Sequence, residues 1–151
     1  MKSFIIVMML MFIGGCSTSA RVPYEKMGLD TTSNFNIPTK GKAGIYVFQW
    51  KTGVLGAGWD VDCGFKGGPE ISLNTGEYGY LEVSPGQYEY RFTGGVFPMY
   101  FPLKIEADKN YFFRGFLLSA TDHCILVMDQ KEIDEAKENI KSGRYELNTV
   151  D

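Results

Sequence analysis

GEYGYLEVSPGQYEYRFTG, residues 76–94, places two strand-like runs on either side of the strongest turn signal in the chain. In both runs apolar or aromatic side chains alternate with others, and a period of two residues indicates β-strands. Pro85 favours the second position of a turn, and Gly86 accepts the positive φ that a type II turn requires at its third position. The stretch therefore predicts a β-hairpin. Because two strands cannot cover their own apolar faces, other segments must pack over them.

Tyrosines are the most distinctive side chains of this predicted hairpin. Only one face of a sheet can lie against a core, so a row of tyrosines on the other face would offer a platform for a glycan or a partner protein. Aromatic cross-strand pairs also stabilise sheets without any binding role, and both interpretations stay open. The candidate aromatic binding face consists of Tyr78, Tyr80, Tyr88 and Tyr90.

Short apolar runs elsewhere in the chain supply further strands. The run AGIYVFQW, residues 43–50, is apolar on both sides, which favours a central position in a sheet. Seven or eight short strands at this spacing predict an all-β fold, an antiparallel β-sandwich of the immunoglobulin or transthyretin-like kind. The other strands are expected near residues 59–64, 70–73, 103–107, 111–118 and 124–128.

The period of the sequence changes after these strands. In DQKEIDEAKENIKSG, residues 129–143, apolar side chains recur every three or four positions, which indicates a helix. Asp129 and Glu132 resemble a capping box, and Gly143 can close the carboxyl end. One short helix is therefore expected to pack across an end of the sheets, followed by a loose tail at 144–151.

The first fifteen residues have the features of an export signal. One early lysine precedes an apolar run at residues 4–13, which is too short to span a bilayer but suits the apolar part of a signal peptide. Ile13-Gly14-Gly15-Cys16 then resembles the lipobox of bacterial lipoproteins. The resemblance implies cleavage between Gly15 and Cys16 and attachment of acyl chains, such as palmitate, to Cys16. Several chains together give stable membrane anchoring.

Two alternatives to this anchor stay open: an ordinary secreted protein, and an uncleaved apolar helix. Ser17 after the cysteine resembles the address of lipoproteins in the outer membrane that face the periplasm. Residues 16–42, rich in Ser, Thr, Asn, Lys and Gly, are then expected to form the lipidated cysteine and a tether. The β-sandwich domain with its terminal helix follows at 43–143.

If lipid occupies Cys16, the remaining cysteines are an even pair in an oxidising compartment. Cys63 and Cys124 are therefore a candidate disulfide. The alternative is two buried thiols on separate strands, and the sequence does not give the distance between them.

Several kinds of chemistry find no support in the sequence. The net charge of −3 without a basic cluster argues against nucleic acid. Asp122-His123-Cys124 contains the residue types of a thiol hydrolase, but neighbours on a strand point to opposite faces, so a strand-end histidine is the better interpretation. No Cys or His pair has zinc-site spacing, and the acidic run at 60–64 lacks the glutamate that completes a calcium loop. The glycines at 53–58 indicate a loop without a following helix. No catalytic residue, metal site or cofactor is expected.

Residues 44–138 resemble the bacterial envelope family called domain of unknown function 2846. Individual motifs are short, and their order along the chain carries the resemblance. It implies a compact sandwich, frequently lipidated, with no established activity. The chain departs from the family pattern at Cys63 and in a longer insert at 65–73. The matching motifs are IYVF in the first strand and the segments 61–64, 76–78, 83–88 and 107–112.

Together these features predict a non-enzymatic lipoprotein of the cell envelope. It would be held at the membrane by its N-terminal lipid and act as a structural or protein-interaction module with an envelope protein as partner. The competing expectation is a lipoprotein that binds a glycan or small ligand through the aromatic face.

Overall fold

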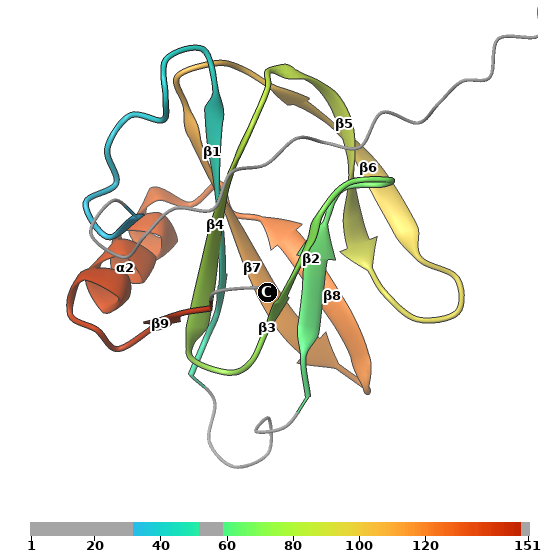
Figure 1. The fold of residues 1–151 in the computed structure, drawn as a ribbon. Coiled ribbons are helices and arrows are strands. Elements are labelled where there is room, and N and C mark those ends of the chain that lie inside the picture. Colours follow the sequence, from blue (N-terminus) through green and yellow to red (C-terminus); the bar gives the residue numbers. More distant parts are fainter. Residues whose placement is uncertain (1–31, 52–58, 149–151) are drawn as a thin grey trace, which may run out of the picture.

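The computed structural model describes residues 32–51 and 59–148, and strands dominate it (Figure 1). The predicted signal peptide, Cys16 and the glycine loop at 53–58 lie outside these residues. The elements are β1 (Ala43–Gln49), β2 (Val61–Gly64), β3 (Glu70–Leu73), β4 (Glu77–Val83), β5 (Gly86–Thr93), β6 (Met99–Ile105), β7 (Asn110–Leu118), β8 (Thr121–Leu126), α2 (Gln130–Lys141) and β9 (Glu146–Leu147).

Seven strands form one large sheet in the order β6-β5-β8-β7-β1-β4-β9, and β2 and β3 form a separate two-stranded sheet. Every residue of β1 is buried between β7 and β4, so the predicted central strand is confirmed. The expectation of a wholly antiparallel sandwich is wrong, because β1 runs parallel to β7 and β4 runs parallel to β9. Parallel neighbours need a long connection, and β2 to β6 lie between β1 and β7 in the chain.

The predicted hairpin at 76–94 is also wrong, although both of its strands are present. β4 pairs with β1 and β9, whereas β5 pairs with β6 and β8. Gly86 is not among the glycines with positive φ, so the type II turn does not form. The carbonyl of Ser84 accepts a hydrogen bond of 2.6 Å from the hydroxyl of Tyr88. The short connection therefore joins two strands that are not neighbours in the sheet.

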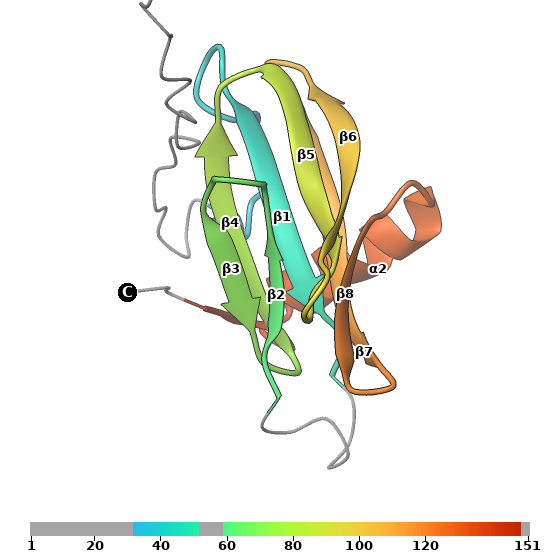
Figure 2. The same ribbon diagram turned by 90° about the vertical axis from the view of Figure 1, so that its right-hand side faces the viewer.

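The main core lies between the large sheet and the small one (Figure 2). Leu81 and Val83 of β4 and the rings of Tyr88 and Tyr90 of β5 all pack in this core, although the two strands have different neighbours in the sheet. The buried members are Ala43, Ile45, Val47, Val61, Cys63, Phe65, Ile71, Leu73, Leu81, Val83, Ile105, Phe113 and Cys124.

Glycines allow the small sheet to approach the large one closely. A Cβ atom at Gly79 of β4 would lie 2.6 Å from Cγ2 of Ile71, and one at Gly115 of β7 would lie 2.8 Å from Cγ1 of Val61. The isolated pairing of Phe65 with Tyr90, together with the hydrogen bond of 2.9 Å from the backbone N–H of Lys66 to the Glu89 carbonyl, joins the chain after β2 to β5. The large sheet thus curls partly around the small one.

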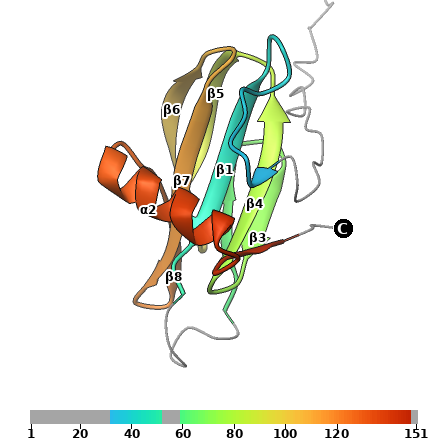
Figure 3. The same ribbon diagram turned by 90° about the vertical axis from the view of Figure 1, so that its left-hand side faces the viewer.

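Helix α2 covers the opposite face of the large sheet, not an end of it as expected (Figure 3). Ala136 and Ile140 pack there against aromatic rings of β1, β4 and β7. Asp129 caps the helix by accepting from the backbone N–H of Lys131, but Glu132 does not complete a capping box. Its carboxylate instead accepts from Arg114 of β7 at 2.8 Å.

Both ends of the described chain pack on this second face. The Phe35 ring lies 5.1 Å from that of Tyr46, although residue 35 belongs to the expected tether. The expected loose tail is wrong for residues 144–148, because Tyr145 is buried and β9 extends the sheet beside β4. The folded unit among the described residues therefore extends from 32 to 148.

Candidate functional site

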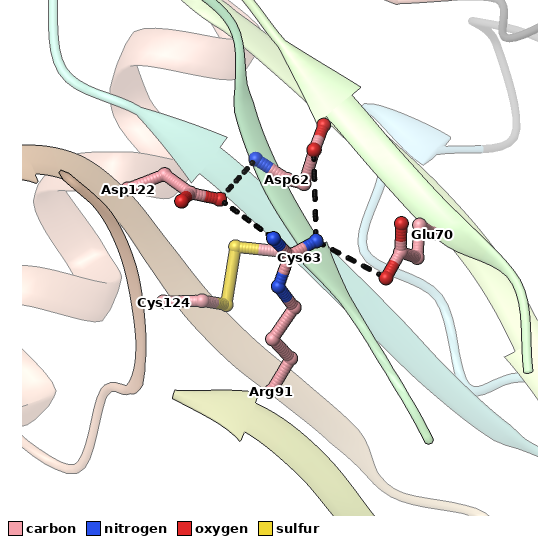
Figure 4. Close-up of a disulfide and its surroundings, with 6 residues drawn as sticks. All are labelled: Asp62, Cys63, Glu70, Arg91, Asp122 and Cys124. Atoms are coloured by element: carbon pink, nitrogen blue, oxygen red, sulfur yellow. Dashed lines mark hydrogen bonds and ion pairs between the residues drawn. A yellow bond between two sulfur atoms is a disulfide. The ribbon is translucent and has the colours of Figure 1, made fainter. Parts of the chain in front are cut away.

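A disulfide joins Cys63 of β2 to Cys124 of β8, with Cα atoms 5.5 Å apart. Of the two alternatives left open by the sequence, the structure has the bridge. Both cysteines are buried. The bond ties β2 of the small sheet to β8 of the large sheet, as Figure 4 shows.

Arg91 makes a second connection beside the disulfide (Figure 4). Its guanidinium lies 3.1 Å from Glu70 on β3, 3.5 Å from Asp62 on β2 and 3.5 Å from Asp122 on β8. The β5–β6 pairing has an irregularity between Arg91 and Thr93, a feature that commonly re-aims one side chain. One cation thus forms ion pairs with three carboxylates from three strands. We call Arg91, Asp62, Glu70, Asp122 and the disulfide the junction.

The junction has no room for a larger residue at Gly94. A Cβ atom there would overlap the Asp122 carboxylate and the Arg91 guanidinium. The backbone N–H of Gly94 also donates to the Asp122 carbonyl at 2.9 Å. The side chain of Arg91 is 14% exposed and that of Asp122 is 15% exposed, so this pair interacts with limited access of water, whereas the side chains of Asp62 and Glu70 are 40% and 49% exposed.

The four candidate tyrosines do not form one exposed face. Tyr78 is fully buried, and Tyr80 packs beside it on the helix side of the sheet. Tyr88 and Tyr90 pack against the core on the other side. The physical reason is that β4 and β5 do not pair. Tyrosines of two strands that are not neighbours do not lie side by side on one face of the sheet, so Tyr78 and Tyr80 pack on the α2 side and Tyr88 and Tyr90 pack against the main core.

A polar network surrounds the tyrosines on the helix side. The hydroxyl of Tyr80 and the backbone N–H of Thr39 each donate to Oε1 of buried Glu82 at 2.9 Å. The hydroxyl of Tyr46 donates to the carbonyl of Thr32 at 2.9 Å. Burial, together with the nearby Glu82 carboxylate, raises the pKa of both Tyr46 and Tyr80 far above the usual tyrosine value. The network holds the segment that precedes β1 against the sheet.

A row of rings that the sequence analysis did not identify crosses the large sheet. Phe101 of β6 lies 5.0 Å from Phe92 of β5, and His123 of β8 lies 5.8 Å from Phe92. The next ring along the row, Phe116 of β7, stacks on His123 at 5.2 Å. At its end the Arg114 guanidinium lies 4.5 Å from the ring of Trp50, which follows β1. We call these six residues the aromatic strip.

The aromatic strip could be found only from the topology. Its members come from the consecutive strands β5 and β6, from the consecutive strands β7 and β8, and from the residue after β1, and the order β6-β5-β8-β7-β1 places them side by side. Trp50 and Phe101 at its two ends are 45% and 43% exposed. Aromatic rings and arginine are the side chains most enriched where protein surfaces bind partners.

The catalytic chemistry weighed from the sequence is not assembled. Cys124 is bonded to Cys63, and His123 lies within β8, where its ring is stacked on Phe116, rather than at a strand end. Among residues 32–51 and 59–148, no group of three or more His, Cys, Asp or Glu side chains could hold a metal ion. An apolar cavity of about 10 Å³, lined by Val47, Phe113 and others, lies between the sheets and has no space for an organic ligand.

In the described part of the chain no helix is long and apolar enough to cross a membrane. Comparison of the sequence and structure with models of protein families, with curated proteins and with solved structures finds no match. The resemblance to domain of unknown function 2846 therefore stays a prediction.

Proposed function

We propose that this protein is a non-enzymatic lipoprotein of the bacterial cell envelope that acts as a structural or protein-interaction module. The lipobox-like Ile13-Gly14-Gly15-Cys16 supports attachment to a membrane, and Ser17 favours the periplasmic side of the outer membrane. The disulfide supports export, because structural disulfides persist in oxidising compartments.

The aromatic strip is the observation that carries the proposed interaction. Helix α2 packs on the neighbouring rings of β1, β4 and β7 and leaves Trp50 and Phe101 exposed. A partner that covered the strip would bury aromatic rings together with a pre-positioned guanidinium, a combination typical of interface centres. A folded envelope protein is the expected partner.

Cross-linking in intact cells, followed by affinity purification, tests the interaction. The double variant Trp50→Ala, Phe101→Ala should lose the partner that the natural chain retains. Met128→Ala is the matched control, since Met128 is 86% exposed and lies outside the strip. Equal recovery of the partner with the natural chain and the double variant would refute the strip as the interface.

A second candidate function is glycan binding by the same strip. The stacked arrangement of Trp50 on Arg114 favours it, because an exposed aromatic ring held flat provides a surface for a sugar ring. Sedimentation with purified peptidoglycan distinguishes the two functions. Retention that is lost in the Trp50→Ala, Phe101→Ala variant would favour the glycan, and no retention would favour the protein partner.

The anchor has its own test. Cys16→Ser should abolish labelling by radioactive fatty acid and leave the precursor unprocessed, because the thiol that accepts the lipid is gone. Continued labelling of this variant would contradict the proposed anchor.

A further inference from the structure

The loop between β5 and β6 and the first residue of β6 expose large apolar side chains. Val96 is 86% exposed, Phe97 is 87% exposed and Met99 is 51% exposed. The Val96 and Phe97 side chains therefore scarcely touch their own chain, and half-exposed Met99 begins β6 beside them. The loop belongs to a longer run, FTGGVFPMYFPL at residues 92–103, which contains no Asp, Glu, Lys, Arg or His.

The base of the loop is held firmly while its tip projects. Gly94 is fixed to Asp122 by its backbone hydrogen bond, next to the junction. Gly95 then has φ of 89°, a left-handed conformation that favours glycine and turns the chain outward. In Figure 1 the loop lies at the edge of the domain away from α2. The tip is therefore a rigidly based apolar projection.

The neighbouring edge does not suit the addition of a strand from another chain. β6 is the outermost strand of the large sheet, but Pro102 in its middle has no N–H to donate. Lys104 on the same strand is exposed, and exposed lysines commonly protect sheet edges from pairing. Residues 95–98 at the tip have no charged or hydrogen-bonding side chain, whereas the charged groups of the junction lie at the base of the loop, beside Gly94.

We propose that the loop around Val96, Phe97 and Met99 inserts into the interface of a phospholipid bilayer. The inference rests on the envelope location given under Proposed function. From lipidated Cys16 to the first described residue, Thr32, the chain spans at most about 58 Å even when fully extended. The domain is thus confined near the bilayer, and apolar side chains at a projecting tip gain by leaving water. Insertion would give the domain a second attachment and one fixed orientation.

Depth-dependent fluorescence quenching tests this orientation in the full chain. Phe97→Trp and, as the matched control, Met128→Trp are purified in detergent and reconstituted into phosphatidylcholine and phosphatidylethanolamine vesicles. Part of the lipid is brominated near the top of the acyl chains. Both positions are more than four-fifths exposed, and both variants contain the same natural tryptophans. A difference between them therefore reports on position 97.

We expect bromine to quench the emission of the Phe97→Trp protein at least about twice as strongly as that of the Met128→Trp protein, with a blue shift on reconstitution. Equal quenching of the two would overturn the proposal. A blue shift without quenching would also overturn it, and would assign the loop to a contact with a second copy or another protein. The intact mass of the same samples reports acylation at Cys16 separately, so a missing anchor is distinguishable from a missing insertion.

Discussion

Arg91 is the single side chain on which the electrostatics of the junction depends. It faces Asp62, Glu70 and Asp122, and its removal would leave three carboxylates close together beside a disulfide. Partly buried charges that lose their partner destabilise a protein, because neither water nor another cation replaces the interaction fully.

We expect Arg91→Met to lower the free energy of unfolding by about 1 to 3 kcal/mol, measured by urea denaturation. Lys66→Met is the control, because Lys66 pairs with Glu89 at 2.8 Å on the open surface and such pairs contribute little. If both variants lost the same stability, the junction would have no special role.

The Cys63–Cys124 disulfide should also contribute measurably to stability. It joins residues 61 positions apart, and removing such a loop constraint typically costs about 2 to 5 kcal/mol. Cys63→Ala, Cys124→Ala should therefore unfold at a lower urea concentration than the natural chain. A reductant should destabilise the natural chain to a similar extent and leave the double variant unchanged. Two free thiols in unreduced mass spectra of the natural protein would contradict the bridge.

At the scale of elements, the close contact between the small and the large sheet depends on glycines, which have no side chain to separate the strands. Gly79 of β4 lies directly under Ile71 of β3, which has a stiff, branched side chain. An alanine methyl group there has no space unless β3 moves.

Gly79→Ala should lower the free energy of unfolding by about 1 to 3 kcal/mol through overpacking. The same change should cost clearly less in a chain that already carries Ile71→Ala, because the Cγ2 atom that the methyl group meets is then absent. Thermal melts of the two single variants and the double variant give this coupling. Additive losses would show that the two sheets do not meet as closely as described.

At the scale of the whole molecule, buried tyrosines link stability to alkaline pH. Burial raises the pKa of Tyr46 and Tyr80 above the ordinary value of 10. The folded chain therefore retains these protons where the unfolded chain loses them. Their contribution to stability is complete below pH 10 and falls as the pH rises towards the raised pKa values.

We expect the free energy of unfolding to fall steeply above about pH 10, with tyrosinate absorbance and loss of β circular dichroism appearing together. Tyr46→Phe should make this dependence shallower, since one buried hydroxyl no longer titrates. At neutral pH the same variant should be less stable by about 1 kcal/mol, because the hydrogen bond to Thr32 is lost. Ionisation of all tyrosines without unfolding would contradict the burial of this cluster.

Much of the local structure could be predicted from the sequence. Alternation of side chains located the strands around residues 43–50 and 76–94, and the spacing of Ile133, Ala136 and Ile140 located α2 with its cap at Asp129. These features depend on neighbours within a few positions, so a short stretch of sequence contains the physical information that specifies them.

Only the tertiary structure decided which strands are neighbours. A turn signal at Pro85 and Gly86 was insufficient to pair β4 with β5, because each strand pairs with other strands while both direct apolar side chains into the same core. For the same reason the candidate tyrosines separated into two layers, while Trp50, Phe116, His123 and Phe101 came together in the aromatic strip. Pairing depends on the total area that distant segments remove from water, and no local pattern specifies that sum.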